Sequence, residues 1–357
     1  MRNAEHKSAL TDLPAKVNVV KRKTFNYFIG IDVSKNELDY AVIYKNDLLF
    51  HRELSNKPDA ILAFVASLKN LPRFTMSASV FCMEDTGIYG NHLLNTLKDL
   101  KANIVVENAF RLKHSMGLVR NKDDKIDSIR IAYYAKRYID RLKMWRSRRE
   151  VVSKLMHLMT VRNRLVGVSV ALKTPVKAQA DFLNENDHKK SALWCEQSRD
   201  ALEADIKAIN QRLVLIVDTD AELKRLFQLV TSVPGIGKLT GIYLLIFTNE
   251  FTDFNDPRKF ACYAGIAPFK VESGIITSKA KVSHIANKRM KKMLHTCAIV
   301  AVIHNPELKA YYKRKLEDGK SKMSVLNAVR NKLVLRVFAC VKQNRIYDKD
   351  YIPGDLS

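Results

Sequence analysis

The first strong pattern in the chain is the apolar run Tyr27–Val33, which carries one acid, Asp32, and is followed at once by turn residues. Apolar runs of this length between turn residues are typical of buried strands. Two further segments, Leu38–Tyr44 and Leu48–Glu53, predict a three-stranded antiparallel meander. Because a buried carboxylate is costly unless it is paired or binds a metal, the pattern singles out Asp32.

Helical and strand patterns alternate after the meander. A helix is predicted from Pro58, since proline is accepted in a first helical turn and four apolar residues share one face. The later patterns predict a strand, a helix and a second strand, followed by a helix to about Tyr138: Ser79–Glu84, the segment with Leu93, Leu94 and Leu97, and Ile104–Glu107. This order indicates an α/β domain of the RNase H type over residues 25–145, after a basic arm at residues 1–24.

Two long helices are predicted next, over residues 150–172 and 193–230, with the polar segment Lys173–Lys190 as the tip between them. The second helix repeats apolar residues at spacings of three and four: Leu202, Ile206, Ile209, Leu213 and Ile216. Such a stripe indicates an antiparallel hairpin or coiled coil, so residues 146–230 form a helical connector. The stripe serves either core packing or oligomerisation.

A third, helical unit is expected over residues 231–343, before a polar, frayed tail at 344–357. Its segment Val233–Lys238 precedes an apolar helix, Leu239–Phe247, and resembles the hairpin of a helix-hairpin-helix element. There, glycines such as Gly235 and Gly237 let the backbone approach phosphate, and Lys238 adds charge. A plain turn between helices is the alternative. More amphipathic helix is predicted around Met290–Ala298 and Val325–Val341.

Charge indicates the class of partner. The chain has a net charge of +24. Residues 1–150 hold 27 Lys and Arg against 17 Asp and Glu, residues 151–230 hold 12 against 10, and residues 231–357 hold 22 against 10. Two basic ends around a nearly neutral middle predict two nucleic-acid-facing regions joined by a structural connector. The densest cluster comprises Lys279, Lys281, Lys288, Arg289, Lys291 and Lys292.

Cysteine spacing and hydropathy exclude other classes. The five cysteines are scattered without CxxC spacing, which argues against a structural zinc site or a disulfide framework. No apolar run approaches 18 residues, so no membrane span is expected, and the polar N-terminus lacks a signal-peptide core. We therefore expect a cytoplasmic, nucleoid-associated protein.

Four acids are candidates for one site. Asp32 lies on the first strand and Glu84 ends the fourth, and these strands are neighbours in an RNase H-like sheet. Asp124 and Asp127 share a helix face, because they are three residues apart. Carboxylates that converge in this way need hard cations, and oxygen-only ligands suit Mg²⁺, two of which can stabilise a phosphoryl transfer. Asp123 is the alternative to Asp124.

A second candidate centre is Ser273, which is followed by Gly274 and the basic cluster. A serine can attack a phosphodiester if cations gather the scissile phosphate and stabilise the developing charge. A solvated turn serine is the alternative, and no histidine lies close in sequence as an obvious base.

Six motifs in order resemble a known family. They are Gly30–Lys35, Met83–Gly87, Asp124–Asp127, Val233–Gly237, Tyr263–Pro268 and Ser273–Gly274. Together they look like the DEDD-type insertion-sequence transposases with a C-terminal serine domain, the bridge-RNA-guided recombinases, which are related to pilin-gene invertases. Glu272, Ile275-Ile276 and Asn108-Ala109 depart from the family pattern, and the first two leave Ser278 open as an alternative nucleophile.

The resemblance implies a function. It implies a RuvC-like domain, a coiled-coil connector and a serine domain that recombine double-stranded donor and target DNA, guided by a structured RNA, in a dimer or tetramer. Asp32, Glu84, Asp124 and Asp127 would bind metal, and Ser273 would form a covalent link to DNA. A junction-resolving nuclease that uses only the acids, and a non-catalytic nucleic-acid-binding protein, are the alternatives.

Overall fold

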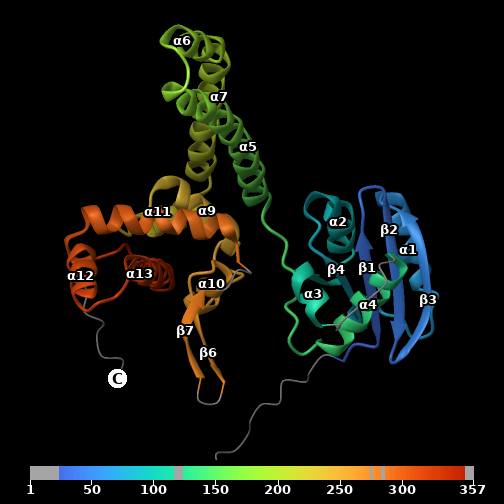
Figure 1. The fold of residues 1–357 in the computed structure, drawn as a ribbon. Helices are drawn as coiled ribbons and strands as arrows, with labels where there is room; N and C mark the ends of the chain where they lie inside the picture. Colours follow the sequence, from blue (N-terminus) through green and yellow to red (C-terminus); the bar gives the residue numbers. More distant parts are fainter. Residues whose placement is uncertain (1–23, 116–123, 274–275, 283–285, 350–357) are drawn as a thin grey trace, which may run out of the picture. The chain divides into compact units, whose positions relative to one another are not determined.

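The chain forms two compact units, Met1–Ser147 and Arg148–Ser357 (Figure 1). The structure is a computed structural model that describes residues 24–115, 124–273, 276–282 and 286–349, without the side chains of residues 124 and 270–281. The expected basic arm, the alternative acid Asp123 and the end of the tail therefore lie outside the described residues.

The first unit contains a five-stranded sheet of order β3-β2-β1-β4-β5. Its strands are β1 (Tyr27–Val33), β2 (Glu37–Tyr44), β3 (Asp47–Ser55), β4 (Ser79–Glu84) and β5 (Asn103–Glu107). The first three pair antiparallel, whereas β4 lies parallel to both β1 and β5. This mixed sheet confirms the predicted α/β class and is consistent with an RNase H-like domain.

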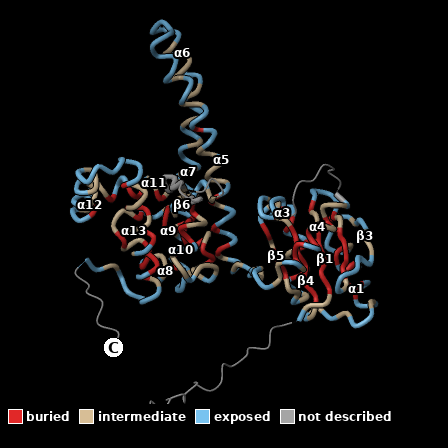
Figure 2. The backbone as a smooth tube through the Cα atoms, turned by 60° about the horizontal axis from the view of Figure 1, so that its bottom comes forward, coloured by how far each residue is buried: buried red, intermediate tan, exposed pale blue. Residues whose placement is uncertain are grey.

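Helices cover both faces of this sheet. They are α1 (Pro58–Leu68), α2 (Asn91–Asp99), α3 (Ala109–Ser115) and α4 (Asp124–Arg137), with short 3₁₀ turns at Met76–Ala78 and Gly87–Gly90. Side chains alternate between faces along a strand, so Ile29 and Ile31 pack with α1 and α2, whereas Phe28 packs with α4. Buried positions accordingly follow the central strands in Figure 2.

The second unit is mainly helical. Its helices are α5 (Glu150–Ala178), α6 (Glu185–Trp194), α7 (Glu196–Thr219), α8 (Ala221–Thr231), α9 (Lys238–Thr248), α10 (Pro257–Tyr263), α11 (Lys288–His304), α12 (Pro306–Glu317) and α13 (Lys322–Lys342), with a 3₁₀ turn at Gln179–Asp181. The first turns of α5 and the last turns of α7 contribute Val152, Leu155 and Val217 to the same core as α9, α11 and α13. The expected separation of a connector from a C-terminal domain stays a prediction.

The helical hairpin differs from the prediction in two places. Helix α5 continues through Pro175 to Ala178, and the expected polar tip contains most of helix α6. The expected helix 193–230 is interrupted at Asp220, whose carboxylate accepts the Leu223 backbone N–H and caps α8. Apolar spacing alone did not mark this break, because apolar residues continue at helical spacing on both sides of the cap.

The second unit also contains a feature that the sequence analysis missed. Strands β6 (Pro268–Ser273) and β7 (Ile276–Val282) pair antiparallel, so the expectation of a purely helical C-terminal region is wrong. The segment is rich in lysine and lacks a long apolar run, and the charge pattern concealed the strands. Helices α10 and α12 were likewise not predicted.

The beginning of the tail is held in place, contrary to the expected fraying from Asn344. Arg225 donates to both the side-chain and the backbone oxygen of Asn344. The Tyr347 backbone N–H donates to Ser232, and the guanidinium of Arg336 lies 5.2 Å from the Tyr347 ring centroid.

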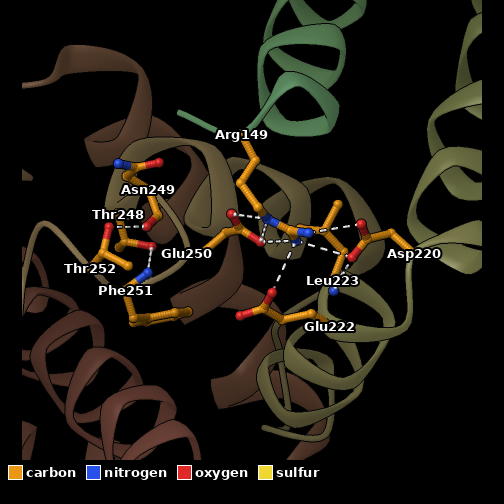
Figure 3. Close-up of polar contacts among 9 residues, drawn as sticks. All are labelled: Arg149, Asp220, Glu222, Leu223, Thr248, Asn249, Glu250, Phe251 and Thr252. Atoms are coloured by element: carbon orange, nitrogen blue, oxygen red, sulfur yellow. Dashed lines mark hydrogen bonds and ion pairs between the residues drawn. The ribbon is translucent and has the colours of Figure 1, made fainter. Parts of the chain in front are cut away.

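Arg149 joins three helical segments at the start of the second unit (Figure 3). Its guanidinium donates to Asp220 before α8 and to Glu250 after α9, and it lies 3.6 Å from a Glu222 oxygen. Glu250 lies in a left-handed turn in which Asn249, Glu250 and Phe251 all have positive φ. The ion-pair network therefore fixes the first turn of α5 against α8 and α9.

Within the ranges that the structure describes, none of the helices is both long and apolar enough to cross a membrane.

Candidate active site and nucleic-acid interface

Strand register brings two of the predicted acids together. Ile31 of β1 pairs with Met83 of β4, so Asp32 and Glu84 lie one residue farther on, at the carboxyl ends of neighbouring parallel strands. Both alternate in phase with Gly30, Val80 and Cys82, which face α4. Asp32 and Glu84 therefore share one edge and one face of the sheet. Both residues are half-buried.

Helix α4 brings the third acid to this face. It packs so closely on β1 that a methyl group on Gly30 would lie 2.2 Å from the Ser128 carbonyl oxygen and the Ala132 nitrogen. Glycine is therefore required at position 30. Because Asp127 directly precedes Ser128, the same contact brings Asp127 close to β1. Asp127 is half-buried and accepts a hydrogen bond of 2.9 Å from Arg130. Asp124 begins the same helix, but its side chain lies outside the description.

The electrostatics of Glu84 indicate that the acids interact. Burial raises the pKa of Glu84 above its usual range, and the nearby negative charges of Asp127 and Asp85 raise it further. Lys113 on α3 opposes this effect. Repulsion between Glu84 and Asp127 means that the site favours a bound cation or a proton.

Two residues that the sequence analysis did not select lie at this edge of the sheet. Glu107 ends β5 in register with Glu84, and its buried carboxylate accepts a 3.1 Å hydrogen bond from Tyr134 of α4. The available signal was a second strand that ends in an acid. The buried Asn56 donates to the carbonyl oxygens of Ser34 and Tyr89 and so joins the loops after β1 and β4. No sequence signal marked Asn56, since asparagine is an ordinary turn residue.

The donor set fits a hard divalent cation in chemical type, because Asp32, Glu84 and Asp127 offer only carboxylate oxygens. Among the side chains that the structure describes, no group of three or more His, Cys, Asp or Glu is arranged to hold a metal. Metal binding by the four acids therefore stays a prediction.

The candidate nucleophile lies in the second unit. Ser273 is the last residue of β6, and its backbone pairs with Ile276 of β7, from which Gly274 and Ile275 separate it in sequence. Ser278, the alternative, pairs with Val271 farther along the ribbon. Both serines belong to the β6–β7 ribbon, the projecting two-stranded element in Figure 1.

Close packing explains one of the two glycines in the turn between α8 and α9. Gly235 has a φ of +94°, and an added methyl group would lie 2.8 Å from Ala301 and 2.9 Å from the Cys297 carbonyl oxygen. Gly237 precedes α9 and has open space around it, and Lys238 beside it is exposed. Of the predicted phosphate contacts in this turn, Gly237 and Lys238 are accessible.

The N-terminus of α11 carries most of the predicted basic cluster. Lys288, Arg289 and Lys292 are exposed, Lys291 is half-exposed, and no acid lies in this first turn. Cations there add to the positive end of the helix dipole instead of offsetting it, which creates a surface that attracts anions. Lys279 and Lys281 lie on β7, but their side chains are outside the described set.

Comparisons with known proteins match both parts of the chain. Residues 29–184 match a transposase family model of the IS110 DEDD type, and residues 227–313 match the "Transposase IS116/IS110/IS902 family". The pilin gene-inverting proteins of Moraxella bovis and Moraxella lacunata are each 23% identical over 327 residues, which cover 90% of this chain and 98% of theirs. An uncharacterised 43.6 kDa protein of the insertion element IS110 from Streptomyces coelicolor is 26% identical over 152 residues, which cover 43% of this chain and 35% of its own.

Proposed function

Because the chain is a transposase of the IS116/IS110/IS902 family with an IS110-type DEDD domain, we propose that it recombines DNA with two centres. One is the acid site of Asp32, Glu84, Asp124 and Asp127, and the other is Ser273. The observation that carries the proposal is the common sheet face of Asp32 and Glu84, together with the interaction between Glu84 and Asp127. The reaction is strand cleavage and rejoining, with double-stranded donor and target DNA as substrates.

The acid site would hold Mg²⁺, which would supply positive charge against the scissile phosphate. Asp32, Glu84 and Asp127 would provide the oxygen ligands together with Asp124. Asn56 would keep the ends of β1 and β4 at a fixed separation through its hydrogen bonds to Ser34 and Tyr89.

Ser273 would form the covalent intermediate. Its hydroxyl oxygen attacks phosphorus and loses its proton, the bond from phosphorus to a deoxyribose oxygen breaks, and that oxygen takes up a proton. In the second half, a deoxyribose hydroxyl of the exchanged strand attacks the phosphoserine and releases Ser273. The number of phosphoester bonds is conserved, so no external energy source is needed.

A guide RNA and oligomerisation complete the proposal. The surplus of positive charge in residues 1–150 and 231–357 gives the chain capacity for a structured RNA in addition to DNA. Exposed apolar side chains near the tip of the α5–α7 hairpin support assembly of dimers or tetramers. The most exposed are Phe182 at 88%, Trp194 at 78% and Leu193 at 63%.

A recombination assay with paired serine variants tests the assignment. Ser273→Ala is expected to abolish strand exchange and leave nucleic-acid binding intact, whereas Ser278→Ala, on the opposite strand of the same ribbon, is expected to retain exchange. The reverse result would transfer the role to Ser278. Wild-type exchange by both variants would contradict the serine mechanism, and DNA cleavage without rejoining would favour a nuclease.

A further inference from the structure

A cavity of about 320 Å³ lies within the second unit, where α5, α9 and the N-terminus of α11 meet. This volume is within the range of about 300–1,000 Å³ that is typical of small-ligand pockets. Its walls are a thioether and aromatic surface with polar groups beside it. The residues used below are Met156, Asn163, Arg164, Tyr243, Phe247 and Arg289.

The aromatic wall is preorganised. The rings of Tyr243 and Phe247, one turn apart on α9, are nearly parallel, with an interplanar angle of 6° and centroids 5.6 Å apart. The buried Tyr243 hydroxyl donates to Asn163 at 2.6 Å and accepts from Arg289 at 3.1 Å. The Arg289 guanidinium also lies 5.9 Å from the Tyr243 ring centroid. These contacts hold the ring and the guanidinium in place before any ligand arrives.

The described acids leave the positive charge beside this cavity without an ion pair. No Asp or Glu is among its lining residues. Arg164 and Arg289 are exposed, and neither has an ion pair with any described acid, whereas Arg149 in the same unit contacts three carboxylates. Two guanidiniums that have no ionic partner among the described acids, beside an apolar, aromatic cavity, match a planar ligand that carries phosphate.

We propose that this cavity binds one unstacked nucleobase of a single-stranded nucleic acid, with an adjoining phosphate on Arg164 or Arg289. Bases stack on aromatic side chains irrespective of sequence, and guanidinium groups add phosphate and cation–π contacts. A base inside a duplex cannot enter, because its faces are covered by its neighbours. The exposed Lys288 and Lys292 on the same helix end would guide the strand to the cavity. This inference rests on the proposed action on nucleic acids and adds a specific contact to it.

The test compares two charge insertions on α5. Met156 lines the cavity and is 40% exposed, and the adjacent exposed His157 does not line it. Met156→Glu places a carboxylate at the cavity, and His157→Glu places the same charge beside it. Affinity for 12-nucleotide single strands is measured by fluorescence anisotropy, with DNA and RNA arms, and with matched strands in which the bases are replaced by abasic sites.

The wild-type chain is expected to prefer strands with bases by about tenfold. Met156→Glu is expected to bind strands with and without bases about equally well, whereas His157→Glu is expected to keep the preference. The base preference is compared between the DNA strands and the RNA strands. The larger preference identifies which nucleic acid supplies the base. Equal effects of the two variants, or no preference for bases in either arm, would overturn the proposal.

These outcomes are independent of strand exchange. Loss of the base preference in Met156→Glu would stand even if Ser273→Ala recombined normally, which would contradict only the proposed chemistry. If Met156→Glu kept the base preference and Ser273→Ala were inactive, the cavity assignment would be wrong and the proposed function would still hold.

Discussion

At the scale of residues, an ionised carboxylate in the acid site destabilises the fold. Glu84 is placed where burial and the charges of Asp127 and Asp85 raise its pKa, so its ionisation lowers the free energy of unfolding. Such conflicts are typical of functional sites, because a side chain selected for stability would be neutral there. The contrast is Asp220, whose pKa is lowered by its hydrogen bond to Arg149 and which therefore stabilises the fold when it is ionised.

Glu84→Gln is expected to raise the thermal unfolding midpoint of metal-free protein at pH 7 and to abolish activity. A group whose folded pKa is raised stabilises the native state at low pH and loses that contribution as pH rises through the folded pKa. The gain should therefore disappear at about pH 3, well below the usual pKa of a glutamate, where Glu84 is protonated in both states. Calorimetry at the two pH values measures it, with the exposed Glu53→Gln as control, and a lower midpoint at pH 7 would contradict this electrostatic account.

Magnesium should stabilise the wild-type chain more than Glu84→Gln. A ligand that binds only the native state stabilises it by mass action. Addition of Mg²⁺ is expected to raise the unfolding midpoint of the wild-type chain and to have little effect on Glu84→Gln. Equal responses of the two proteins in differential scanning calorimetry would show that Glu84 is not a metal ligand.

At the scale of elements, one close contact between backbones aligns the site. Helix α4 can approach β1 only because residue 30 is glycine, and the contact positions Asp127 on the face that holds Asp32 and Glu84. Gly30→Ala should cost about 3 kcal/mol of stability, since backbone atoms 2.2 Å away must move. Gly167→Ala is the control: its site in α5 is open, so it should gain about 0.5–1 kcal/mol. Urea denaturation measures both, and similar effects would contradict the packing argument.

A second element-scale prediction concerns the Arg149 network. Arg149→Met would leave Glu250, whose side chain is 6% exposed, without its partner, and should cost about 2 kcal/mol. Lys189→Met removes an exposed i,i+4 pair with Glu185 and should cost less than about 0.5 kcal/mol. Urea midpoints of the full chain compare them, and equal losses would mean that Arg149 acts only as a surface charge.

The elements also show why part of the structure followed from the sequence. The bounds of β1 and β4 were predicted because buried parallel strands are nearly continuous apolar runs, and these strands placed Asp32 and Glu84 correctly at adjacent strand ends. The β6–β7 ribbon was missed, because its sequence is dominated by charge. The role of Asn56 depends on contacts between loops more than 20 residues apart, and local periodicity contains no such information.

At the scale of the whole molecule, the chain divides into an acid-bearing unit and a basic helical unit with the candidate serine. Neutralising Z phosphates of duplex DNA gives a salt slope of about −0.9Z in a plot of log affinity against log salt. The double change of Lys288 and Lys292 to Gln should reduce this slope by about 2 and weaken binding to unrelated duplexes uniformly. An unchanged slope in equilibrium titrations would exclude the N-terminus of α11 from the interface.

The central claim is that Ser273 forms a covalent bond to DNA and that the acid site is needed for it. Wild-type protein, incubated with labelled donor and target DNA, guide RNA and Mg²⁺ and then denatured, should give a DNA band whose slow migration is reversed by protease. Ser273→Ala and Asp32→Asn should give none. A protease-sensitive adduct of equal yield in Ser273→Ala would contradict the account.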